Sequence, residues 1–227
     1  MKSLIFSLLF SFTIFYAPVS QTEEIISVTI KVTNEEENPL IGAHVEIIKE
    51  LKKQADDVKV MPVVFKDGNR EINSKSFPFD FESRKKMLEA IFGDSIKITD
   101  DYSFQAPFKK YLPPLVRRKS WKLRKQILGG IEGDYFSYTG DKAEGYMLKM
   151  YRLRPKIGER KSLSATSVKE KLYDAALGKK SSWKEDVPEE IINIIEEEWK
   201  TVEKFANEED QTTRIVGMKF PKEGYSK

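Results

Sequence analysis

Apolar and polar residues recur along this chain with two periods, one typical of strands and one typical of helices, and segments of the two kinds follow each other. Ser27–Thr33 alternates apolar and polar positions and is rich in β-branched residues, which is typical of a strand. The next regular segment, Gly42–Gln54, places Val45, Ile48 and Leu51 on one helical face with charges opposite. The pattern therefore predicts a strand followed by an amphipathic helix.

The same succession continues toward the C-terminus. Further strands are expected over Asp57–Phe65, with Pro62 as an interruption, and over Ser95–Thr99 and Tyr135–Tyr138. Helices are expected over Asp80–Phe92, most of Leu112–Leu128, Lys142–Met150, Ser167–Leu177 and Pro188–Ala206, while Arg152–Leu163 returns the chain to the sheet. Strands that alternate with helices predict an α/β fold with a mainly parallel sheet flanked by helices and a C-terminal helical extension. In such folds ligands bind where the strands end, so loops after strands are the place to look for chemistry.

The N-terminus has a different pattern. Lys2 precedes an apolar run over Leu4–Ala17, and polar sequence follows at Gln21, which is the arrangement of a secretory signal peptide. The run is short for a transmembrane helix, and a buried first element of the fold is the alternative. We expect a leader over residues 1–20, an α/β domain over 27–206 and a tail over 207–227. Contact with a membrane is expected only through the leader; the chain is exported if the leader works as a signal and cytoplasmic if it does not.

The composition of the chain excludes several kinds of functional site. The 39 basic and 36 acidic residues give a net charge of +3, which is no argument for a polyanion partner. A basic run over Arg117–Lys125 contains Trp121, but a solvated helix face is the favoured interpretation over contact with nucleic acid. Cysteine is absent and His44 is the single histidine, so disulfides, thiolate sites and multi-histidine metal sites are excluded and no protein metal site is predicted.

A phosphate site is predicted in the loop that opens the Ser167 helix. This loop reads L-S-A-T-S-V-K over Leu163–Lys169. Free backbone N–H groups and the positive end of a helix attract anions. Ser164 and Thr166 add hydroxyl donors and Lys169 adds a mobile positive charge, although both hydroxyl residues also suit simple helix caps.

This stretch resembles the I-S-x-T-x-x-R signature of nucleotidyltransferases such as the nicotinamide mononucleotide (NMN) adenylyltransferases and the phosphopantetheine adenylyltransferases. Trp183 and Val187-Pro188 follow it with a spacing similar to that of the NMN enzymes, and Lys169 stands where the family usually has arginine. The resemblance implies a Rossmann-like fold.

Two upstream segments are similar to family motifs in the same order. Phe79–Leu88 resembles an F-x-x-x-E-R-x-x-M-L helix, which implies that Arg84 lies near the substrate. Tyr138–Asp141 resembles a Y-T/S-G-N/D strand end, which implies that Gly140 and Asp141 meet the nucleotide.

The first family motif, G-x-F-x-P-x-H/T-x-G-H, has a degenerate counterpart over Glu35–His44. The resemblance places Asn38, Gly42 and His44 at nucleotide-binding positions, with His44 on the triphosphate. Ile41 occupies the first His/Thr position, and three glutamates precede Asn38.

The activity implied by the resemblance is transfer of an adenylyl or cytidylyl group to a phosphate-bearing acceptor such as NMN, with release of pyrophosphate. ATP or CTP with Mg²⁺ is the implied donor, and the implied partners are this nucleotide and the acceptor. His44 and Lys169 are the candidate catalytic residues. The candidate nucleotide-binding residues are Asn38, Gly42, Arg84, Gly140, Asp141, Ser164 and Thr166.

A second resemblance points to a different class of protein. The segment around Pro39-Leu40, Gly42-Ala43 and Val45 is similar to the start of carboxypeptidase regulatory-like β-sandwich domains. Together with the leader, it implies an exported, non-enzymatic protein used for binding. The two hypotheses differ in whether the first strand belongs to a parallel sheet or to a β-sandwich.

Overall fold

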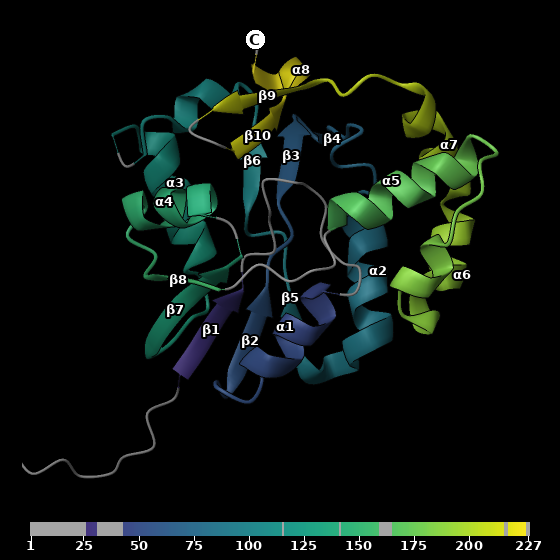
Figure 1. Cartoon of the computed structure of the whole chain (residues 1–227). Coiled ribbons are helices and arrows are strands. Elements are labelled where there is room, and N and C mark those ends of the chain that lie inside the picture. Colours follow the sequence, from purple (N-terminus) through teal and green to yellow (C-terminus); the bar gives the residue numbers. More distant parts are fainter. Residues whose placement is uncertain are drawn as a thin grey trace, which may run out of the picture.

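The protein is an α/β molecule whose centre is a parallel five-stranded sheet (Figure 1). The computed structural model describes residues 26–30, 43–114, 116–140, 142–158, 165–215 and 218–225. The sheet has the order β5-β2-β1-β7-β8, and each neighbouring pair is parallel. Its strands are β1 (Ile26–Ile30), β2 (Asp57–Val60), β5 (Lys97–Ile98), β7 (Asp134–Thr139) and β8 (Pro155–Ile157).

Two smaller sheets lie beyond the carboxyl ends of the central strands. The first has the order β4-β3-β6, and the second is an antiparallel hairpin. Their strands are β3 (Val64–Asp67), β4 (Arg70–Glu71), β6 (Ser103–Gln105), β9 (Thr212–Ile215) and β10 (Met218–Pro221). In Figure 1, β3 continues the path of β2 and the hairpin lies above it.

Helices connect the strands and cover both faces of the central sheet. The α-helices are α1 (Ala43–Leu51), α2 (Phe81–Phe92), α3 (Arg118–Ile127), α4 (Lys142–Met150), α5 (Ala165–Ala176), α6 (Glu189–Glu197), α7 (Trp199–Asn207) and α8 (Lys222–Tyr225). Short 3₁₀ turns are η1 (Gly93–Ser95), η2 (Phe108–Tyr111) and η3 (Trp183–Asp186). The predicted α/β fold is confirmed.

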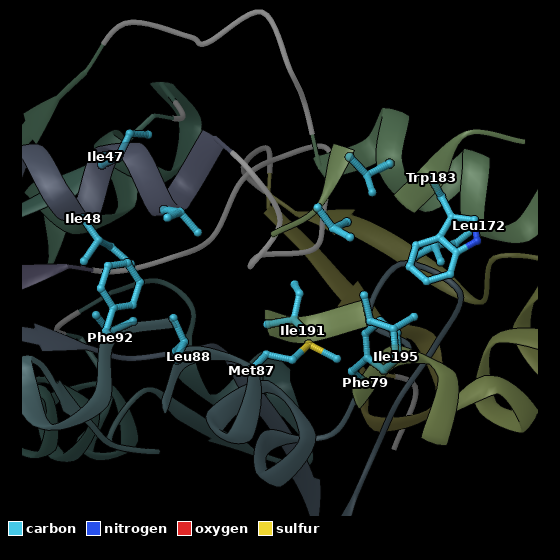
Figure 2. Packing of buried hydrophobic residues seen from close by; sticks show 14 of the residues in the cluster. Ile47, Ile48, Phe79, Met87, Leu88, Phe92, Leu172, Trp183, Ile191 and Ile195 are labelled. Carbon is cyan, nitrogen blue, oxygen red and sulfur yellow. The ribbon is translucent and has the colours of Figure 1, made fainter. Parts of the chain in front are cut away.

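Alternation along β2 separates the two faces of the sheet. Val58 and Val60 belong to one buried cluster, whereas Lys59 points the other way and donates to the backbone oxygen of Gly129, 2.9 Å away. The cluster around Val58 and Val60 also contains apolar residues of α1, α2, α5, α6 and α7, and Figure 2 shows Ile48, Leu88 and Ile191 within it. The opposite cluster joins α3 and α4 to β3, β6 and β10.

The first strand lies in the middle of the parallel sheet. β1 pairs in parallel with β2 on one side and with β7 on the other, and α1 follows it. An antiparallel β-sandwich, which the second resemblance implied for this region, is not what these pairings form.

Two parts of the C-terminal third differ from the sequence pattern. The expected single helix over Pro188–Ala206 is two helices, α6 and α7, that meet at Glu198. The Glu198 carboxylate accepts a hydrogen bond from Ser83 Oγ at 2.8 Å, so a contact with α2 lies at the break. The segment after Asn207, where the sequence shows no clear period, forms the β9–β10 hairpin.

Candidate nucleotide site at the strand ends

The order of the central strands reverses between β1 and β7. From β1 the chain proceeds to β2 and β5 on one side, then crosses over to β7 and β8 on the other. In open parallel sheets, loops diverge at such a reversal, and ligands bind there at the carboxyl ends of the strands. In this chain those ends are Ile30 of β1 and Thr139 of β7.

Three helices begin after strands that end at this edge. α1 follows β1, α4 follows β7 and α5 follows β8, so each helix starts on the carboxyl side of the sheet. The N-terminal ends of α1 and α5 lie toward each other (Figures 1 and 2). Val45 and Ile48 of α1 share a buried cluster with Val168 and Leu172 of α5. Helix N-termini carry partial positive charge, so the edge suits an anion.

Several predicted residues lie outside the described part of the chain. These are Asn38, Gly42, Asp141 and Ser164. His44 lies in the first turn of α1, but its side chain is likewise outside the description. The degenerate first motif and the proposed anion loop before Thr166 therefore stay predictions.

Two other predicted residues lie at the expected ends of elements. Gly140 directly follows β7 and is exposed, and a Cβ at this position would meet no atom within 4 Å. Thr166 lies in the first turn of α5 and is half-buried. Both positions are at the carboxyl edge of the sheet, and their contact with a nucleotide stays a prediction.

Lys169 reaches out of α5 to the loop before α2. Its ammonium group donates to the backbone oxygen of Ser76 at 3.1 Å. Tyr173, one turn further along α5, donates from its hydroxyl to the backbone oxygen of Lys75 at 2.7 Å. These two bonds fix the position of the Lys75–Ser76 loop relative to the start of α5.

Lys219 of the C-terminal hairpin reaches the same loop and was missed by the sequence analysis. Its ammonium group donates to Ser76 Oγ at 3.0 Å and forms an ion pair with Asp210 Oδ2 at 3.4 Å. Two positive side chains, from α5 and from β10, thus meet at Ser76. The sequence signal that could have found the hairpin is T-T-R-I followed by V-G and M-K-F, two short strand-like runs around a two-residue turn.

Asp210 holds this group of side chains together. Its Oδ2 accepts hydrogen bonds from Ser76 Oγ at 2.7 Å and from Thr212 Oγ1 at 2.9 Å. Burial alone would raise the pKa of the Asp210 carboxyl, but the bonds from Ser76 and Thr212 and the charge of Lys219 lower that pKa overall. Asp210 is therefore ionised at neutral pH and keeps Lys219 on Ser76.

Arg84 is buried among backbone and carboxylate groups of the protein. Its side chain is 1% exposed and donates to the backbone oxygen of Val63 at 2.8 Å and to Glu71 Oε1 at 3.1 Å. Burial lowers the pKa of the guanidinium, and the Glu71 carboxylate opposes this change. The described contacts of Arg84 are all within the protein: they join α2 to β4 and to the Met61–Val63 segment. A contact between Arg84 and substrate stays a prediction.

A buried carboxylate lies at the start of α4. Glu144 is 2% exposed and accepts a hydrogen bond from Thr139 Oγ1 at 2.6 Å. A negative charge is favourable in the first turn of a helix, and this bond links the last residue of β7 to α4. Glu144 therefore positions α4 relative to the strand end.

The described residues contain no group of three or more His, Cys, Asp or Glu side chains that could hold a metal ion. In the same part of the chain, no helix is both long and apolar enough to span a membrane.

Comparison with known proteins shows the fold. No family model matches the sequence, and no curated protein matches it significantly. The structure is similar to that of a bifunctional NMN adenylyltransferase/ADP-ribose pyrophosphatase from Francisella tularensis, solved in complex with AMP and a Mn ion. The TM-score is 0.51 at 16% identity, with 81% of this chain and 52% of that chain covered. A second structure described as the same Francisella bifunctional protein has a TM-score of 0.48 at 20% identity, with 67% of this chain and 43% of that chain covered.

The chain spans about half the length of this neighbour. At such low identity the likeness shows a shared α/β fold and nothing more. It carries no information about individual site residues.

Proposed function

We propose that this protein is a nucleotidyltransferase that moves an adenylyl or cytidylyl group from a nucleoside triphosphate to a phosphate-bearing acceptor. The observation that supports this most is the reversal of strand order between β1 and β7, with α1, α4 and α5 all beginning at that edge. The neighbour with this fold is described as an NMN adenylyltransferase and holds AMP and a Mn ion, which favours a nucleotide and a divalent metal here. NMN is the first acceptor to test.

The reaction needs little covalent chemistry from the protein. An oxygen of the acceptor phosphate attacks the α-phosphorus of the donor, a new P–O bond forms, and the bond to the bridging oxygen breaks. The electron pair of that bond leaves with pyrophosphate. Positioning in line and stabilisation of the developing charge supply most of the rate enhancement in such transfers.

Positive groups near the start of α5 suit the departing pyrophosphate. In the proposal, Ser164, Thr166 and Lys169 hold the β- and γ-phosphates, and the positive end of α5 adds to their field. Lys219 is added to this set because it lies beside Lys169 at Ser76. A lysine supplies charge without the two-pronged geometry of arginine, so it holds a phosphate as a point charge.

The other predicted residues lie before and at the start of α1 and directly after β7. His44, with Asn38 and Gly42 before it, is proposed to contact the triphosphate at the start of α1. Gly140 and Asp141 are proposed to meet the nucleotide after β7, where the space over Gly140 is open. Mg²⁺ accompanies the triphosphate and neutralises part of its charge.

The test is release of pyrophosphate from ATP, or from CTP, with Mg²⁺ and NMN, measured together with the shift in melting temperature that each nucleotide causes. We expect pyrophosphate only when donor, metal and acceptor are all present. A thermal shift by ATP without pyrophosphate release would retain nucleotide binding and reject NMN as acceptor. Absence of both signals for both nucleotides would reject the proposed function.

A further inference from the structure

A basic groove runs between α4 and the edge strand β8, away from the start of α5. It has a volume of about 880 Å³, within the range of known ligand sites. The groove is lined by Lys142, Gly145, Tyr146, Lys149, Arg152, Arg154, Pro155 and Ile157. Four of these eight side chains are cationic and none is acidic.

The positive charges of this groove are mostly uncompensated. Arg154 pairs with Asp134 at 2.9 Å, whereas Lys142, Lys149 and Arg152 form no ion pair with any residue in the described part of the chain. The local sequence has the same bias: Arg117–Lys156 contains eleven Lys and Arg residues and four Asp and Glu residues, or +7, against +3 for the whole chain. Like charges gathered around one hollow favour a bound polyanion.

An exposed aromatic ring lies among these charges. Lys142, Tyr146 and Lys149 stand at positions i, i+4 and i+7 of α4 and so share one face, and Tyr146 is 67% exposed. Ile157, across the groove on β8, is 49% exposed. A flat ring between two cations on a helix face about 10 Å long matches a stacked base with phosphates on either side.

Two arginines of the groove are held in an unusual backbone conformation. Arg152 has φ 55° and Arg154 has φ 48°, the left-handed region that normally favours glycine. Arg152 occupies the C′ position of a Schellman motif, because the N–H of Leu153 bonds the Leu148 oxygen and the N–H of Arg152 bonds the Lys149 oxygen. Glycine is the usual residue there, so an arginine suggests a role outside folding.

The basic helix α3 adjoins the groove. Arg124 Nε of α3 donates to the backbone oxygen of Tyr151 at 2.9 Å, directly before Arg152. Trp121 of α3 is 42% exposed, and it lies between basic residues of the same helix. A second basic helix with an exposed aromatic ring therefore contacts the backbone next to Arg152, at one end of the groove.

We propose that the α4–β8 groove binds single-stranded nucleic acid, with a base stacked on Tyr146 and phosphates on Lys142, Lys149 and Arg152. A duplex hides the faces of its bases and cannot stack on Tyr146 in this way. An anionic membrane surface fits less well, because the apolar groups line a hollow instead of protruding from the surface. The near-neutral charge of the whole chain conceals this site, since the excess of positive charge is confined to one segment.

The experiment is a fluorescence-anisotropy titration of labelled 12-nucleotide single strands of RNA and DNA with the full chain, repeated at several salt concentrations. Three variants are compared with the wild type: Tyr146→Ala, Tyr146→Phe and Arg152→Gly. Arg152→Gly removes one charge and leaves the residue that the backbone conformation favours, so loss of folding does not obscure the result. Lys180→Ala, an exposed position after α5, is the matched control for loss of one charge.

We expect Tyr146→Ala to raise the Kd at least fivefold, while Tyr146→Phe stays within twofold of the wild type, since stacking needs only the ring. Arg152→Gly should raise the Kd and reduce the slope of log K against log salt by about 0.7. The RNA and DNA arms show which sugar is preferred. The proposal is overturned if Lys180→Ala weakens binding as much as Arg152→Gly, or if Tyr146→Ala has no effect. It is also overturned if a duplex of the same sequence binds as tightly, or if phosphatidylserine vesicles are bound and the single strands are not.

Discussion

Lys169 and Lys219 donate to the two oxygen atoms of one residue, Ser76, although they lie on a helix and a hairpin and are fifty positions apart in sequence. Lys169 contacts the backbone oxygen at 3.1 Å and Lys219 contacts the side-chain oxygen at 3.0 Å. Two ammonium groups that converge at this point repel each other unless negative charge lies nearby, and Asp210 supplies part of it. A triphosphate at the start of α5 would supply more.

The first prediction follows from this pair of lysines. Lys169→Ala and Lys219→Ala should each weaken ATP–Mg²⁺ binding about tenfold or more, because each removes a charged donor to a phosphate. Lys169→Arg should keep binding, since it restores the residue usual in the resembling family. Thermal shift against ATP concentration measures the effect, with Lys200→Ala on the exposed face of α7 as control. Wild-type shifts in both alanine variants would remove these lysines from the site.

Most helices and strands could be predicted from the sequence because local patterns of residues determine where they begin and end. The β2–α2 region shows this: Pro62 marks the interruption between β2 and β3, and Asp80 caps α2 by accepting from the Ser83 N–H at 2.8 Å. The break between α6 and α7 could not be found in this way, because the apolar period continues through it. Glu198 ends α6 and precedes α7, and its carboxylate accepts a hydrogen bond from the Ser83 hydroxyl of α2.

The site was only partly predictable for a related reason. Lys169 belongs to a local motif at a helix start, which a sequence pattern can show. Ser76 and Lys219 are separated by 143 positions, and only the packing of the hairpin against the Lys75–Ser76 loop brings them together. Arg84 was recognisable as part of a helix motif, but its burial against Glu71 depends on β4, a two-residue strand without a sequence signal.

The second prediction concerns Arg84. Arg84→Met should destabilise the protein by about 3–5 kcal/mol, because it leaves the half-buried Glu71 carboxylate without its partner. The double variant Arg84→Met/Glu71→Gln should recover part of this loss, since the glutamine side chain still accepts from the Phe81 N–H. Urea unfolding monitored by circular dichroism measures both. If the single variant unfolds within about 1 kcal/mol of the wild type, the ion pair does not hold α2 in place.

The third prediction is a pH dependence that comes from Asp210. The folded protein lowers the pKa of this carboxyl below its ordinary value of 3.8, so the folded state favours the ionised form. The resulting stability is fully present above the ordinary value and is lost as the pH falls through the lowered pKa. Asp210→Asn should therefore be less stable than the wild type by about 1–2 kcal/mol at pH 7, with allowance for partial exposure.

The measurement for Asp210 is the difference in unfolding free energy between wild type and Asp210→Asn from pH 7 to pH 2.5. We expect this difference to shrink as the pH falls below the ordinary value of 3.8, because the carboxyl is protonated first in the unfolded chain and only at lower pH in the folded protein. Asp174→Asn is the control, since the Asp174 side chain is 44% exposed and pairs only with Lys179, at 2.7 Å, among the described ion pairs. A difference that stays constant over the whole range would show that Asp210 acts through shape and not through charge.

The last prediction separates stability from binding at Arg152. A non-glycine residue in the left-handed conformation costs about 1 kcal/mol, and the Schellman bonds around Arg152 are made by its backbone and not by its side chain. Arg152→Gly should therefore unfold at an equal or higher urea concentration than the wild type while it binds a single strand more weakly. Lys149→Gly, which places glycine inside α4, should lower the free energy of unfolding by about 1 kcal/mol. It should also weaken binding of the single-stranded nucleic acid. If Arg152→Gly instead destabilises the protein, the arginine side chain itself supports the fold, and its unusual backbone conformation no longer argues for a role in binding.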